Sequence, residues 1–494
     1  MKKERLSSEE RGFFRMVYHA AFANPFSELR EKLDRKIAGH FPGLSKSESG
    51  DRYIREIDMR IRRLEKEGRG HLDSFSGQDR SIIKIVFLFD LFYKFRDRFD
   101  RLIVDQIKAG DESVPVVFAD EAMAIIRRRG IPEETILHYF AFSYQLRRAF
   151  FFISHSLVGN SQCMKTLRRN LWNNVFTHNI DLYDRYLWNR MEDFSTLILG
   201  ETGTGKGTAA MAMGRSGYIP FDLKKRRFSV SFTRAFSSLN LSQFPEALLE
   251  SELFGHKKGA FTGAVEDYQG VFDRCSPHGS ILLDEIGEVA DHVQVKLLQV
   301  LQERFFTPVG SHSQSRFQGR VIAATNRSVS AILNGEVFRD DFYYRLCSDI
   351  IEVPPLRERI SQDPTELDDL LEFTVKRMAG SASGELTTRV KRVINKELGP
   401  DYRWPGNVRE LEQCVRRVMM RKSYEGREQA GKKDLGERLA QGIKAGNMAV
   451  SSLIAGYCTL LYREHNTYEQ VAKRTGLDRR TVKKYIDGFK DNVA

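Results

Sequence analysis

Residues 196–208 read TLILGETGTGKGT, a short apolar run followed by a glycine-rich loop with a lysine near its end. Such a run predicts a buried strand, and the residues after the lysine predict the start of a helix. In that setting glycines let backbone N–H groups turn inward around phosphate oxygens, and Lys206 reaches the β- and γ-phosphates. A glycine-rich turn before an ordinary helix shares this pattern, so the neighbouring motifs decide. The predicted nucleotide-binding loop comprises Gly200, Glu201, Thr202, Gly203, Thr204, Gly205, Lys206, Gly207 and Thr208.

Two further apolar runs have the same character, GSILLDEIGE at 279–288 and GRVIAATNRS at 319–328. Three buried strands separated by helical segments predict a parallel α/β sheet. Thr325 and Asn326 end the last run with polar groups suited to reporting the state of the γ-phosphate.

An acid pair, Asp284 and Glu285, ends the middle run at the sheet edge where parallel sheets bind ligands. Position 207 is glycine, whereas the common form of the phosphate loop has a Ser or Thr whose hydroxyl binds magnesium. We therefore expect Asp284 to hold Mg²⁺ and Glu285 to polarise the attacking water. Alone, two acids at the end of a strand are more often simply exposed to solvent at the edge of the sheet. Because a phosphate loop lies upstream, we favour a role at the nucleotide site instead.

Three arginines follow the strands: Arg339 and Arg345 in FRDDFYYRL, and Arg409 after the rigid Trp-Pro-Gly turn of WPGNVREL. Taken singly, each is most simply a surface residue. Phosphoryl transfer, however, needs positive charge on the γ-phosphate, and a guanidinium from a neighbouring subunit supplies it well. This interpretation predicts a ring of subunits.

The chain has 494 residues, a net charge of +12 and 41% apolar residues, which predict about three globular domains and favour a polyanionic partner such as nucleic acid. Its five cysteines lie far apart without CxxC spacing, so neither a zinc site nor a disulfide framework is indicated. We expect a reducing, cytoplasmic location and no membrane-spanning segment.

The composition and predicted secondary structure change several times along the chain. The first part is helical, the strands then begin, helical sequence returns, and a polar, glycine-spotted stretch precedes a compact helical tail. The predicted parts are a mostly helical N-terminal domain at 1–185, an α/β subdomain at 186–356, a helical lid at 357–422, a linker at 423–447 and a helical domain at 448–494.

Residues 255–270, GHKKGAFTGAVEDYQG, place one phenylalanine among glycines, alanines and a threonine. For an isolated stretch of this kind, the simplest interpretation is a tight turn whose Phe261 folds back into the core. The alternative is an exposed tip, with Gly259 and Gly263 letting the loop move and Phe261 acting as an apolar anchor at an interface.

From Leu197 to Arg417 the chain resembles the AAA+ ATPase domain of bacterial enhancer-binding proteins, the activators of sigma-54 RNA polymerase. The resemblance rests on LLESELFGHKKGAFTGA, GSILLDEIGE, RVIAATNR, FRDDFYYRL, VPPLRER and WPGNVRELE, and GAFTGA is highly specific to this family. It implies that the tip interpretation holds and that a sigma-factor contact is made by Gly259, Ala260, Phe261, Thr262, Gly263 and Ala264.

The resemblance also implies roles at the nucleotide site. Lys206 and its loop bind ATP, and the acid pair serves Mg²⁺ and hydrolysis. Arg339 and Arg345 are arginine-finger candidates, and Arg409 senses nucleotide from the lid. Asn240 aligns with the asparagine that restrains the catalytic glutamate, although the path from Lys206 to Asn240 is longer than usual and carries the basic run LKKRRF. The family usually has glutamate at position 207.

The tail NTYEQVAKRTGLDRRTVKKYIDGF resembles the Fis-like helix-turn-helix that ends many of these activators. Ala472 is small where two helices approach, Gly476 permits the turn and Val482 anchors the second helix. A small helical bundle with a solvated basic face is the alternative. The residues expected to contact DNA are Arg479, Arg480, Thr481, Lys483 and Lys484.

The N-terminal part lacks the acidic pair, strand-ending aspartate and later lysine of a response-regulator receiver, and we expect it to be a regulatory module of another kind. The sequence as a whole predicts an ATP-dependent transcriptional activator that binds an upstream site on double-stranded DNA, forms a ring and remodels sigma-54 RNA polymerase. An AAA+ unfoldase or helicase loader, and a catalytically inactive DNA-binding regulator, are the alternatives.

Overall fold

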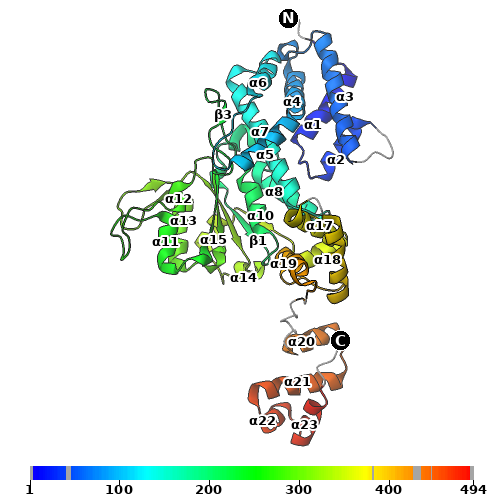
Figure 1. Ribbon diagram of the computed structural model, residues 1–494, viewed down its shortest axis with the longest axis vertical. Coiled ribbons are helices and arrows are strands. Elements are labelled where there is room, and N and C mark those ends of the chain that lie inside the picture. Colours follow the sequence, from blue (N-terminus) through cyan, green and yellow to red (C-terminus); the bar gives the residue numbers. More distant parts are fainter. Residues whose placement is uncertain are drawn as a thin grey trace. The chain divides into compact units, whose positions relative to one another are not determined.

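The computed structural model describes residues 4–39, 46–380, 383–424, 426, 435–446 and 448–489 (Figure 1). The chain divides into two compact units, residues 1–395 with 400–422 and residues 396–399 with 423–494. None of the described helices combines the length and apolar character needed to cross a bilayer.

The N-terminal part is helical, as predicted. Its first helix begins at a capping box, in which the Ser7 hydroxyl accepts a hydrogen bond from the Glu10 amide and the Glu10 carboxylate accepts one from the Ser7 amide. Aromatic and branched side chains of these helices form one buried core. The helices are α1 (Ser8–Phe22), α2 (Glu28–Ala38), α3 (Lys46–Lys66), α4 (Gly77–Lys94), α5 (Arg96–Ala109), α6 (Ala119–Arg128), α7 (Glu133–Ser156) and α8 (Gln162–Phe176).

A five-stranded parallel sheet follows, in the order β4-β5-β8-β1-β9. Most residues of β1, β5 and β8 are buried, as expected for strands covered by helices on both faces. The predicted parallel α/β fold is therefore confirmed. The strands are β1 (Thr196–Leu199), β4 (Phe236–Asn240), β5 (Ser280–Asp284), β8 (Arg320–Thr325) and β9 (Asp349–Glu352).

Helices and short hairpins complete the α/β domain. Its second core cluster contains apolar residues of α11, α13 and α15 together with the sheet. These elements are the two-stranded pairs β2 (Phe221–Asp222) with β3 (Arg227–Phe228) and β6 (Phe305–Phe306) with β7 (Ser315–Arg316), and the helices α10 (Lys206–Gly214), α11 (Glu246–Phe254), α12 (Val271–Arg274), α13 (Asp291–Glu303), α14 (Val329–Leu333) and α15 (Asp340–Leu346).

Four helices form the lid that the sequence predicted after the sheet. A buried ion pair of 2.7 Å joins Arg359 to Glu366 at its start. The Glu366 carboxylate also accepts a hydrogen bond from the Ser161 amide at 2.6 Å, which ties the lid to the turn after α7. The lid helices are α16 (Leu356–Gln362), α17 (Glu366–Ala379), α18 (Ser383–Glu397) and α19 (Asn407–Arg421).

Helix α7 joins the N-terminal helices to the α/β domain. The fully buried Arg148 donates hydrogen bonds to the carbonyl oxygens of Arg215 and Gly217, at 2.8 and 2.6 Å, in the turn after α10. Gln145, one turn earlier, donates to the Ser216 carbonyl at 3.0 Å. Because these carbonyls end the helix that begins at Lys206, α7 is fixed directly to the element that follows the phosphate loop.

The long segment between Lys206 and Asn240 forms the β2–β3 hairpin, which docks on the N-terminal helices. The Phe228 ring stacks on Tyr144 of α7 at 4.2 Å, and Arg226 forms a 2.7 Å ion pair with Asp120 of α6. The Arg226 carbonyl accepts a hydrogen bond from the Val116 amide at 2.9 Å. The extra length noted in the sequence therefore builds a contact between the two parts of the first unit.

The second unit contains α21 (Val450–His465), α22 (Tyr468–Thr475) and α23 (Arg479–Asp487), packed around Cys458, Val471 and Val482. Helix α20 (Leu435–Ala445) lies within the predicted linker and packs against α21, with Leu435 and Leu439 buried. The compact C-terminal unit thus begins earlier than the sequence suggested, and residues 427–434 of the linker lie outside the described residues.

Replacing Arg148 by methionine should destabilise the first unit by about 2–4 kcal/mol, because two buried carbonyl oxygens lose their donors. Arg127→Met is the matched control, since its ion pair with Glu133 is solvent-exposed and should contribute little to stability. Urea unfolding followed by circular dichroism measures both. Equal transition midpoints for the two variants would contradict the anchoring role of Arg148.

Candidate functional site

The phosphate loop lies between the carboxyl end of β1 and the first turn of α10. Lys206 is buried, and its ammonium donates hydrogen bonds to the carbonyl oxygens of Gly200 and Glu201, at 2.9 and 3.4 Å. Burial lowers the pKa of Lys206, and the charges of Glu285 and Asp284 oppose that shift. The Cβ positions of Gly205 and Gly207 meet no atom within 4 Å, so open space borders the amino end of α10.

The lid closes on this loop through the Trp-Pro-Gly-Asn turn. A side chain at Gly203 would place its Cβ only 2.3 Å from the Gly406 carbonyl oxygen, so only glycine permits this approach. The Arg409 amide donates to the Gly203 carbonyl at 3.3 Å. Asn407, fully buried with a φ of +52°, donates from its side chain to the Thr202 carbonyl at 3.1 Å.

An ion pair between the lid and the same loop reinforces this contact. Arg357 of the lid reaches both carboxylate oxygens of Glu201, at 2.5 and 2.7 Å. The hydrogen bond from Arg357 is the main reason why the pKa of Glu201 is lowered. Asn407 and Arg357 were not among the residues that we singled out from the sequence, although both lie in the motifs WPGNVRELE and VPPLRER.

The acid pair faces the phosphate loop from the neighbouring part of the sheet. Asp284 ends β5, and its carboxylate accepts a hydrogen bond from the Glu285 amide at 3.0 Å. Glu285 has a φ of +57°, an uncommon conformation for a residue with a side chain. Its Oε2 atom is buried and has no hydrogen-bond partner among the described residues. An unpaired carboxylate oxygen at this place is available to a water or a substrate group.

Polar residues at the carboxyl ends of β4 and β8 complete this edge of the sheet. The Asn326 amide nitrogen donates to the Thr202 hydroxyl at 3.4 Å, while the Thr325 hydroxyl accepts from the Arg327 amide at 3.2 Å. Asn240 pairs in register with Asp284, but its side-chain oxygen accepts from the amide and hydroxyl of Ser242. The restraint of Glu285 by Asn240, which the resemblance implies, therefore stays a prediction.

A cavity of about 510 Å³ opens beside Glu285 and Asn326. Its other walls come from the start of α11 and from the turns around Leu241 and Val289. Within the described residues, no group of three or more His, Cys, Asp or Glu side chains could hold a metal ion by itself. A magnesium ion commonly takes one or two carboxylates together with phosphate oxygens, and Asp284 fits that smaller requirement.

The two finger candidates lie at α15: Arg339 directly precedes this helix and Arg345 lies near its end. Arg339 is exposed and forms a 2.9 Å ion pair with Asp341. Arg345 donates to the Leu301 carbonyl at 2.8 Å and lies 3.8 Å from Asp193. No hydrogen bond of either guanidinium to Gly200–Thr208 is found in the described structure, and their role as fingers stays a prediction.

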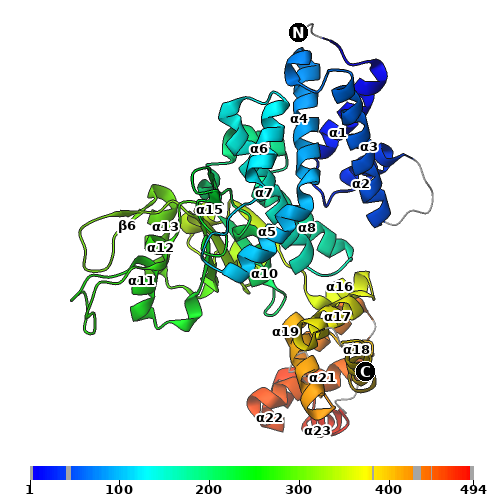
Figure 2. The same ribbon diagram turned by 45° about the horizontal axis from the view of Figure 1, so that its top comes forward.

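The loop around Phe261 projects from the α/β domain beside the β6–β7 segment (Figure 1, Figure 2). The Gly259 amide donates to the Ala264 carbonyl at 2.8 Å, which closes the loop, and the Val309 carbonyl accepts from the Lys257 amide at 2.9 Å. Phe261 is half-buried and its ring contacts His256 edge-on at 4.9 Å. Thr262 and Gly263 are exposed, whereas Ala264 is buried.

The predicted DNA-contacting residues lie at the start of α23 and along its surface. Asp478 caps this helix and accepts hydrogen bonds from the amides of Arg480 and Thr481, each at 3.0 Å. The Thr481 hydroxyl donates to Asp478 at 2.6 Å, and Arg479 pairs with Glu469 at 3.0 Å. Arg480, Lys483 and Lys484 are exposed.

Residues 178–352 match the family model described as the sigma-54 interaction domain. A Nif-specific regulatory protein of Azotobacter vinelandii is 42% identical over 230 residues, which are 47% of this chain and 40% of that protein. The DNA-binding transcriptional regulator NtrC of Azospirillum brasilense is 39% identical over 226 residues, 46% of this chain and 43% of that protein. The chain thus spans less than half the length of these curated relatives. Residues 178–352 therefore match a sigma-54 interaction domain, and over this region the chain is similar to bacterial Nif-specific and NtrC-type regulators.

Proposed function

We propose that this protein activates transcription by binding upstream DNA through α21–α23, assembling into a ring and coupling ATP hydrolysis to the remodelling of sigma-54 RNA polymerase in the cytoplasm. The observation that carries the proposal is the combination, on one α/β domain, of a phosphate loop closed by a lid, an unpaired acid beside it and the projecting loop 259–264. A remodelling ATPase with another target has no reason to carry that loop.

The nucleotide edge has the parts that ATP hydrolysis needs. Backbone N–H groups in the first turn of α10 would bind phosphate oxygens, and the Lys206 ammonium would exchange its two loop carbonyls for the β- and γ-phosphates. Asp284 would hold Mg²⁺, which neutralises phosphate charge when bound. Glu285 acts as the base, because its free oxygen can accept a hydrogen bond from the attacking water. Arg409, Thr325 and Asn326 would report nucleotide state to the lid and the sheet.

We propose a ring because the predicted arginine fingers would act on the nucleotide of a neighbouring subunit. Within their own chain, Arg339 is held by an exposed ion pair, and Arg345 by one carbonyl contact and a long ion pair with Asp193. A stronger anionic partner can replace these contacts. A neighbouring subunit that presents α15 to the nucleotide edge would add the positive charge that the phosphate loop lacks. In this arrangement neither subunit hydrolyses ATP efficiently alone.

Glu285→Gln should retain ATP binding and lose most turnover, about a hundredfold or more, because an amide is a far weaker base than a carboxylate. Glu303→Gln is the matched control, since Glu303 is exposed at the end of α13 and lies outside the cavity beside Glu285. A coupled phosphate-release assay measures turnover, and calorimetry with a slowly hydrolysed ATP analogue measures binding. Parental turnover in Glu285→Gln would overturn the assignment.

Phe261→Ala should leave the melting temperature and ATP turnover near those of the parent, because the ring is half-buried and outside the two main core clusters. It should abolish the sigma-54 complex formed with an ATP transition-state mimic. Val265→Ala, an exposed apolar residue of the same loop, should keep it. A loss of about 3–5 kcal/mol in Phe261→Ala would instead indicate a core residue.

Arg480→Ala combined with Lys483→Ala should weaken DNA binding. It should also reduce the slope of the logarithm of the binding constant against the logarithm of the salt concentration, by about one for each lost phosphate contact. Lys444→Ala with Arg421→Ala removes the same charge from exposed sites outside α21–α23 and serves as control. Fluorescence anisotropy with duplex DNA at several salt concentrations measures the slope. An unchanged slope would favour a solvated basic face with no role in binding.

A further inference from the structure

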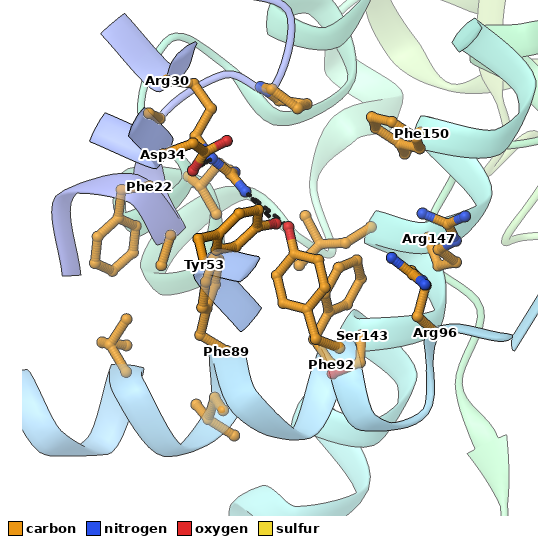
Figure 3. Close-up of a pocket in the computed structure, with 18 of the residues that line it drawn as sticks. Phe22, Arg30, Asp34, Tyr53, Phe89, Phe92, Arg96, Ser143, Arg147 and Phe150 are labelled. Atoms are coloured by element: carbon orange, nitrogen blue, oxygen red, sulfur yellow. Dashed lines mark hydrogen bonds and ion pairs between the residues drawn. The ribbon is translucent and has the colours of Figure 1, made fainter. Parts of the chain in front are cut away.

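A cavity of about 880 Å³ lies among the N-terminal helices, away from every residue assigned above to nucleotide, sigma-factor or DNA binding. Its walls come from α1 to α5 and from α7 and α8. This volume lies in the range of sites that enclose a small organic molecule. Figure 3 shows Arg30 and Asp34 on one side of the cavity and Arg96 and Arg147 on the other, with aromatic rings between them.

The wall is dominated by aromatic side chains. Rings of Phe22, Phe89, Phe92, Phe142, Phe150 and Trp172 line it. Large, rigid rings of this kind provide flat apolar surfaces, against which another aromatic ring gains both burial and favourable stacking. The shape and chemistry of the wall therefore favour a planar, largely apolar molecule.

The charged groups of the wall compensate one another. Arg30 pairs with Asp34 at 2.8 Å, and Arg147 with Asp100 at 2.5 Å. In all, four arginines and five carboxylates line the cavity, a formal charge of −1. The net negative charge of the wall would repel an anionic ligand, and arginines that already pair with carboxylates would not be free to bind it. The wall therefore favours an uncharged occupant.

Hydrogen-bond donors in the wall remain without acceptors. The indole nitrogen of Trp172 is buried and has no partner among the described residues, and only 4% of the residue is exposed. Arg30 donates to the hydroxyl oxygens of Tyr53 and Tyr93, at 3.3 and 2.7 Å. Each hydroxyl thus accepts a hydrogen bond and still carries a hydrogen of its own that can be donated. Buried donors of this kind call for an acceptor on the ligand.

We propose that this cavity binds an uncharged aromatic small molecule bearing a hydrogen-bond acceptor, and that its occupancy controls ATP turnover through α7. The second half of the proposal rests on the proposed function. The first half concerns the cavity alone and can be tested without ATP or DNA.

Helix α7 connects the cavity to the ATPase domain because its two faces serve different partners. Tyr139, Phe142, Ser143, Leu146, Arg147 and Phe150, spaced by three or four residues, face the cavity. The opposite face carries Phe140, Tyr144 and Arg148, which contact the β2–β3 hairpin and the turn after α10. A ligand that shifts or stiffens α7 therefore acts on the helix that starts at Lys206.

Calorimetry on the full-length protein with 2-acetylnaphthalene as probe tests the binding half. Naphthalene, which lacks the acceptor, should bind about tenfold more weakly, the difference expected for one lost buried hydrogen bond. 2-Naphthoate keeps acceptors but should also bind about tenfold more weakly, because its charge would be buried in a wall of net negative charge. No saturable binding of 2-acetylnaphthalene would overturn the proposal. Tightest binding of 2-naphthoate would replace it with an anion site.

Ser143→Leu should weaken binding of 2-acetylnaphthalene by about tenfold or more, because the larger side chain fills the space beside α7. Ser154→Leu, the same change three turns along α7 and outside the cavity wall, should bind like the parent.

Trp172→Phe keeps a ring and removes the hydrogen-bond donor. It should weaken the binding of 2-acetylnaphthalene by about threefold to tenfold and leave the binding of naphthalene unchanged. Parental binding of 2-acetylnaphthalene in both Ser143→Leu and Trp172→Phe would place the probe elsewhere.

ATP turnover with and without saturating 2-acetylnaphthalene tests the control by α7. The probe should change turnover by about fivefold or more in one direction, and Ser154→Leu should respond like the parent. Phe228→Leu, outside the cavity, should bind the probe normally and respond less. Equal turnover with and without bound probe would overturn the coupling. Absence of turnover under all conditions would refute the proposed function, and calorimetry would still decide the cavity.

Discussion

The parallel register of the central sheet is the constraint on which the rest of the molecule depends. Strands β1, β5 and β8 run in one direction and lie next to one another, so their carboxyl ends meet at a single edge. This brings the loop after Leu199, the acid pair after Leu283 and the polar residues after Ala324 into one site, although long stretches of chain separate them. An antiparallel arrangement would distribute the same motifs over opposite edges. The lid then closes on that edge through Gly203, where only a residue without a side chain fits.

The N-terminal helices are joined to this sheet by buried polar contacts as well as by apolar packing. Arg148 and Gln145 satisfy carbonyl groups in the turn after α10, and Glu366 binds Arg359 and the Ser161 amide between the lid and the end of α7. Buried groups of this kind are costly to separate from their partners, because each would lose its hydrogen bonds without regaining water. Helix α7 is therefore anchored directly to the α/β domain, and the turn after it is anchored to the lid. The cavity lies on another face of the same helix.

Several residues show why a motif alone does not describe a site. Asn240 is correctly placed opposite Asp284, yet its side chain bonds to Ser242. Thr481 lies at the start of α23, but its hydroxyl is used by the helix cap. Phe261 is neither a core residue nor fully exposed, because the His256 ring covers one side of it. In each case a neighbour outside the motif, or a short local hydrogen bond, decides what the side chain contacts.

The sequence by itself determined the parallel α/β fold and the helical character of both flanking parts, because these depend on local glycine patterns and apolar runs. It also placed the glycine-rich loop and the acid pair after buried strands, which is where they lie in the structure. The tertiary structure alone decided what the long segment before Asn240 does, which residues of the lid reach the phosphate loop and how the N-terminal helices are joined to the α/β domain. It also decided that aromatic residues scattered from Phe22 to Trp172 enclose a cavity. Burial and pairing between such distant residues leave no periodic pattern in the sequence, since they depend on how whole helices pack.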